Sequence, residues 1–103
     1  MAEAARRLDS PIDLADRRLM RSLAYVGGRW TLAENARFVP VTDPADGAVI
    51  GEVAFLGADG ARAAVEAAQE AFPAWAGLLP QQRSAILRRW HDLIVEHRED
   101  LAV

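Results

Sequence analysis

Ser84 and His91 are the nearest approach in this sequence to a nucleophile and its base. Seven residues of helix would place them about 10 Å apart along the axis, at about 1.5 Å per residue. Proton transfer needs a separation of about 3 Å between heavy atoms. The two residues therefore do not form a catalytic dyad, and Ser84 is interpreted as a residue of the first turn of a helix.

The spacing of the candidate metal ligands does not favour a metal site. His91 and His97 are six residues apart, so on a helix they point to different faces and cannot bind one ion together. Asp43 and Asp46 flank a turn, where an aspartate at the first position serves the turn itself. The other paired carboxylates are interpreted as solvated helix charges; they are Glu66, Glu70, Glu99 and Asp100.

The chain of 103 residues contains no cysteine, which excludes a thiol nucleophile, a disulfide framework and a thiolate metal site. It also lacks a GxGxxG phosphate-binding loop and a glycine loop followed by Lys and Ser or Thr. The residues therefore assign no catalytic, cofactor-binding or metal-binding position.

Charge and hydropathy exclude two classes of partner. The net charge is −3 and the twelve basic residues, all Arg, are scattered along the chain, which does not favour nucleic acid. No apolar run approaches the roughly 20 residues of a membrane helix. Six Arg precede residue 30, but Asp13 and Asp16 are unusual in a transit peptide, so a cytoplasmic location is expected.

The amino-terminal part of the chain predicts a helix after a loose start. Residues 1–9 are short, polar and rich in Ala and Arg, as is typical of a flexible lead-in. Ser10 and Pro11 resemble an N-cap followed by proline at the first helical position. Apolar residues recur at helical spacing after Pro11, which predicts a short amphipathic helix over residues 11–22.

Two β-hairpins follow in the predicted order. Gly27 and Gly28 form a two-residue turn between β-prone flanks. A second extended run, residues 38–42, leads into Asp43, Pro44 and Gly47, a composition that favours a type I turn closed by a left-handed residue. Residues 49–55 then return as a strand.

The helical period returns after Gly57, so the predicted fold class is α+β with antiparallel strands. Asp59 is a candidate cap for a helix that Pro73 and Gly77 would end, with Trp75 in the connection. Arg62 and Glu66 can pair on that helix. Pro80 opens a further helix whose apolar stripe holds Ile86, Leu87, Trp90, Leu93, Ile94 and His97.

The order of these features resembles the start of the aldehyde dehydrogenase superfamily over residues 25–103. The resemblance is carried by YVGGRW, FVPVTDPADGAVIGEV and AAVEAAQEAFPAWAGLLPQQRSAILRRWHDLIVEHREDLA, read in that order. Residues 26–30 (VGGRW) and 87–93 (LRRWHDL) look most like succinate semialdehyde dehydrogenases, and related semialdehyde and medium-chain enzymes share much of the pattern. The chain departs from the family at residues 79–82, where relatives often have a Thr or Ser cap and a Glu.

The resemblance implies a longer enzyme with a cofactor-binding domain, a catalytic domain and an oligomerisation arm. Its chemistry uses a Cys thiolate on a small aldehyde, hydride transfer to NAD or NADP, and a Glu-activated water. None of these residues can be carried onto a position here, so this chain alone is expected to bind no cofactor and to be inactive. The complete enzyme is expected to be a homo-oligomer.

Residues 10–103 are accordingly interpreted as a truncated amino-terminal portion of an aldehyde dehydrogenase domain, whose partner is the remainder of that fold. An alternative stays open at this point. The chain can also be a small non-enzymatic α+β interaction module that docks through its apolar helix face.

Overall fold

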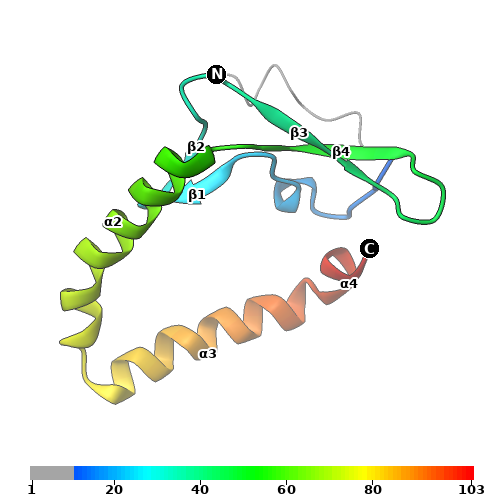
Figure 1. Ribbon diagram of the computed structural model, residues 1–103. Coiled ribbons are helices and arrows are strands. Elements are labelled where there is room, and N and C mark those ends of the chain that lie inside the picture. The colour runs from blue at the N-terminus through cyan, green and yellow to red at the C-terminus, as the bar shows by residue number, and fades with distance from the viewer. Residues whose placement is uncertain (1–10) are drawn as a thin grey trace.

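The computed structural model describes residues 11–103 and has the predicted α+β architecture, with two separate antiparallel sheets followed by helices (Figure 1). The predicted lead-in, residues 1–9, and the Ser10 cap lie outside the described residues. The elements in chain order are η1 (Arg17–Leu19), β1 (Ala24–Val26), β2 (Arg29–Thr31), β3 (Phe38–Thr42), β4 (Val49–Ala54), α2 (Gly57–Ala76), α3 (Pro80–Glu96) and α4 (Arg98–Ala102).

The first hairpin confirms the predicted glycine turn. Gly27 and Gly28 have φ angles of 58° and 78°, the left-handed pair that a two-residue turn of the I′ type requires. Tyr25 lies opposite Trp30 in the register of β1 and β2, and their ring centroids are 5.0 Å apart. Aromatic pairs of this kind are a main source of cross-strand stabilisation.

The second hairpin, β3 with β4, is also confirmed. The Asp43 carbonyl accepts a hydrogen bond from the Gly47 amide at 2.7 Å, and Gly47 has a φ of 76°. Because a β-carbon is strained at that angle, glycine is the favoured residue there. The turn therefore forms from local interactions alone.

The predicted helix over residues 11–22 is wrong except for the single 3-10 turn of η1. Three hydrogen bonds with distant parts of the chain hold this segment in a non-helical path. The amides of Ala15 and Asp16 donate to the carboxylate of Asp100 in α4, each at 2.8 Å. The Ser22 carbonyl accepts from the Ala54 amide at 2.7 Å, so the segment runs beside the second hairpin.

Helix α2 differs from the prediction at both ends. Leu56, not Asp59, is the N-cap. Asp59 lies inside the first turn, where its negative charge interacts favourably with the positive end of the helix dipole. Arg62 pairs with Asp59 at 3.0 Å and not with Glu66. Pro73 lies within the helix, because the Gly77 amide donates to the Pro73 carbonyl and completes another turn. Trp75 consequently belongs to α2, not to the connection.

Helix α3 begins at Pro80 as predicted. The Gln82 side chain accepts a hydrogen bond from the Leu79 amide at 2.8 Å, which is the reciprocal half of a capping box. Gln82 therefore takes the role that a glutamate has in that motif. The helix start is kept although residues 79–82 differ from the usual family sequence. Helix α4 follows directly after His97.

The described residues enclose no apolar core. Among them Ser22, at 8% exposure, is the buried polar residue and no hydrophobic side chain is buried. The radius of gyration is 16.5 Å, whereas a compact chain of this length has about 13 Å. The accessible surface is 8311 Å², against about 5,700 Å² expected for a folded monomer of this mass.

The elements instead follow an open ring (Figure 1). The first hairpin lies beside α2, α2 leads into α3 through a short connection, and α3 is followed by α4. Asp100 then ties α4 back to residues 15 and 16. These two hydrogen bonds link the end of the chain to the start of its described part.

The two hydrogen bonds accepted by Asp100 lead to a first prediction, on amide exchange. Replacing Asp100 with Ala leaves the Ala15 and Asp16 amides without their acceptor, so their hydrogen exchange should become roughly tenfold faster. The matched control is Glu99→Ala, because Glu99 pairs with its neighbour Arg98. Exchange measured by mass spectrometry should change for Asp100→Ala only, and equal effects of both variants would contradict the assignment.

Candidate functional site

Ser84 and His91 lie two turns apart on the outer side of α3 and do not contact each other. They border one open depression of about 590 Å³, which is also lined by Pro80, Arg83, Leu87 and Arg88. The His91 Nδ1 atom lies 3.2 Å from a carboxylate oxygen of Asp92. Because the depression is shallow and both side chains are exposed, it excludes no water and offers no acid–base site.

The other predicted candidates are also held in local interactions. Asp43 accepts a hydrogen bond from the Ala45 amide at 2.8 Å, and Asp46 accepts one from the Ala48 amide at 2.9 Å. Both carboxylates serve the turn. Within residues 11–103 no three His, Cys, Asp or Glu side chains gather as a metal site would require.

The strongest charge interaction lies at Asp16, the N-cap of η1. The Arg18 guanidinium donates to both carboxylate oxygens of Asp16, at 3.0 Å and 2.8 Å, and the Arg18 amide donates at 3.0 Å. These bonds lower the pKa of Asp16 to about 2. His97 contributes a smaller lowering across the ring. The arrangement stabilises a turn and has no geometry for catalysis.

Arg83 holds the junction between α2 and α3. Its Nη1 atom donates to the carbonyl of Ala76 at 3.2 Å and to that of Leu78 at 3.1 Å. The carbonyls at the carboxyl end of a helix lack donors within the helix. A guanidinium there donates hydrogen bonds to them, and its positive charge interacts favourably with the negative end of the helix dipole. Arg83 lies within the segment that carries the family resemblance, but its acceptor carbonyls could not be read from the sequence.

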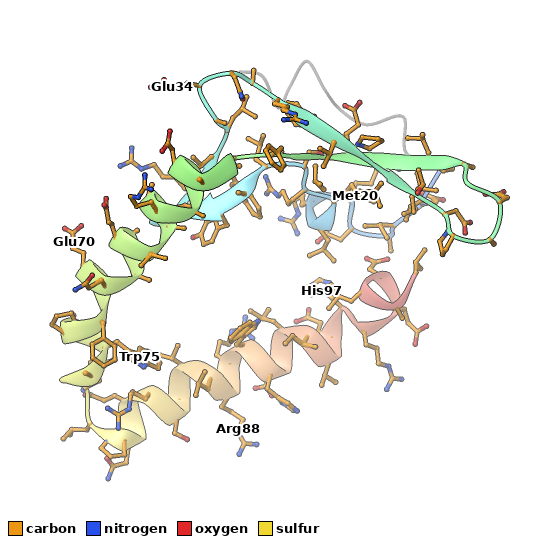
Figure 2. All side chains as sticks on the ribbon, viewed as in Figure 1. Met20, Glu34, Glu70, Trp75, Arg88 and His97 are labelled. Atoms are coloured by element: carbon orange, nitrogen blue, oxygen red, sulfur yellow. The ribbon has the colours of Figure 1, made fainter. Side chains whose placement is uncertain are left out.

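The apolar stripe of α3 is largely uncovered. Ile86, Trp90 and Ile94 are 51%, 63% and 46% exposed. Positions 86, 90, 94 and 97 share one side of a helix, opposite position 88. In Figure 2, His97 points toward η1 and the sheets while Arg88 points away from them. The stripe therefore faces the inside of the ring, which we call the concave face.

Comparison with known proteins accounts for this incomplete packing. Residues 30–103 match the model of the aldehyde dehydrogenase family. The chain belongs to the aldehyde dehydrogenase family. It is 46% identical over 91 residues to a glutarate-semialdehyde dehydrogenase of Pseudomonas putida, covering 88% of this chain and 19% of that protein.

Two further relatives agree with this assignment. The NADP(+) succinate-semialdehyde dehydrogenase of Escherichia coli is 45% identical over 86% of this chain and 18% of its own length. A crystal structure of an E. coli NADP-dependent enzyme is 44% identical, with a TM-score of 0.83, over 87% of this chain and 19% of that one. The chain thus spans about a fifth of these relatives and represents part of a domain.

The residues that carry the family pattern have structural roles in this chain. Gly28 supplies a left-handed turn residue, Trp30 packs on Tyr25, and Gly47 closes the second turn. Arg83 fixes the helix junction. The exposed apolar stripe of α3 on the concave face is therefore the candidate surface of this chain.

We predict that replacing Arg83 with Met loosens the junction of α2 and α3. Loss of two hydrogen bonds from a charged donor should destabilise the last turn of α2 by about 1–2 kcal/mol. Amide exchange at residues 77–79 measures the change. The control is Arg88→Met on the outer face of the same helix, and equal acceleration by both variants would show that Arg83 has no special role.

The pKa of Asp16 gives a prediction with a defined sign. A carboxyl whose pKa falls from 3.8 to about 2 in the folded chain stabilises the turn above about pH 4 and loses that contribution as the pH falls toward 2. A carbon-13 NMR titration should give a midpoint of about 2, and Arg18→Gln should return it toward 3.8. A midpoint near 3.8 in the unaltered chain would refute the assigned interaction.

Proposed function

We propose that this chain is the amino-terminal part of the cofactor-binding domain of an NAD(P)-dependent aldehyde dehydrogenase that oxidises a semialdehyde to the carboxylic acid. The observation that carries the proposal is the 45–46% identity to two semialdehyde dehydrogenases over more than four-fifths of the chain. We place residues 10–103 in that domain. Succinate semialdehyde is the proposed substrate, with glutarate semialdehyde as the homologue to be measured beside it.

This chain alone does not carry the chemistry. The family reaction needs a thiolate, and the chain contains no cysteine. NAD or NADP would supply the hydride acceptor in the complete enzyme. The chain has no GxGxxG phosphate-binding loop, and we propose no residue of this chain as a nucleotide ligand. The contribution of the chain is to shape and support the cofactor domain.

The proposal also covers the cellular location and the oligomeric state of the enzyme. No helix within residues 11–103 is long and apolar enough to span a membrane. We propose a cytoplasmic enzyme and, by analogy with the family, a homo-oligomer. The alternative of an independent interaction module is disfavoured, because a module that folds alone must bury apolar side chains and the described residues bury none.

A chimera tests the proposal. Residues 25–103 of this chain should replace the matching segment of the E. coli succinate-semialdehyde dehydrogenase, which is 45% identical. We expect a soluble chimera that reduces NADP with succinate semialdehyde at a rate within about tenfold of the parent, because volume-conserving changes are tolerated in a packed core.

Two controls make the outcome decisive. The isolated 103-residue chain should form no NADPH, since it has no thiol. A chimera that also carries Arg83→Met should lose thermal stability while its KM changes little. A folded, oligomeric chimera that binds NADP but does not oxidise either semialdehyde would contradict the proposed function.

A further inference from the structure

We draw no further inference here: the strongest candidate, the surface patch on the first hairpin where the exposed rings of Tyr25 and Trp30 lie beside the Arg21 guanidinium, carries nothing because nothing in the structure shows what covers it.

Discussion

The apolar side chains on α3 stay largely exposed within the described chain, and this lack of full burial is the main constraint on the rest of the structure. Burial of apolar surface is the dominant favourable contribution to folding, and here no hydrophobic residue among residues 11–103 is buried. What holds the elements in place is a small set of hydrogen bonds at the ends of helices and strands. Such bonds each contribute about 1 kcal/mol net, so they direct the chain without replacing a core.

These hydrogen bonds explain how the segment keeps its outline without a buried apolar core. The glycine turn at residues 27 and 28, the Asp43 turn and the Gln82 cap are local and need no partner. Arg83 and Asp100 act over longer range, at the helix junction and at the closure of the ring. The elements are thereby presented in the relative positions seen in the related crystal structure.

The parts of the fold that could be predicted from the sequence are those determined by neighbouring residues. Both hairpins, the start of α3 at Pro80 and its apolar stripe follow from turn chemistry and periodicity. The helix expected over residues 11–22 fails because its backbone is held by Asp100, some 85 positions away, which no local pattern indicates. The continuation of α2 past Pro73 depends on the Gly77 amide finding the Pro73 carbonyl.

The candidate site was likewise predictable only where it depends on neighbouring residues. The spacing of Ser84 and His91 in the sequence was enough to predict that they do not form a dyad. The sequence also shows that the chain has no cysteine to act as the family nucleophile. The location of the exposed stripe on the inside of a ring could not be anticipated, because it depends on how hairpins and helices are placed relative to one another (Figures 1 and 2). Gly47 and Arg83, which lie in the segments that carry the family resemblance, have local structural roles in this chain.

Small-angle X-ray scattering of the isolated, dilute chain tests the central claim most directly. An open ring without a core predicts a monomer whose radius of gyration stays near or above the 16.5 Å of the structure. A monomer with a radius of about 13 Å, the value for a compact domain of this length, would mean that the chain covers its own apolar stripe and would contradict the account.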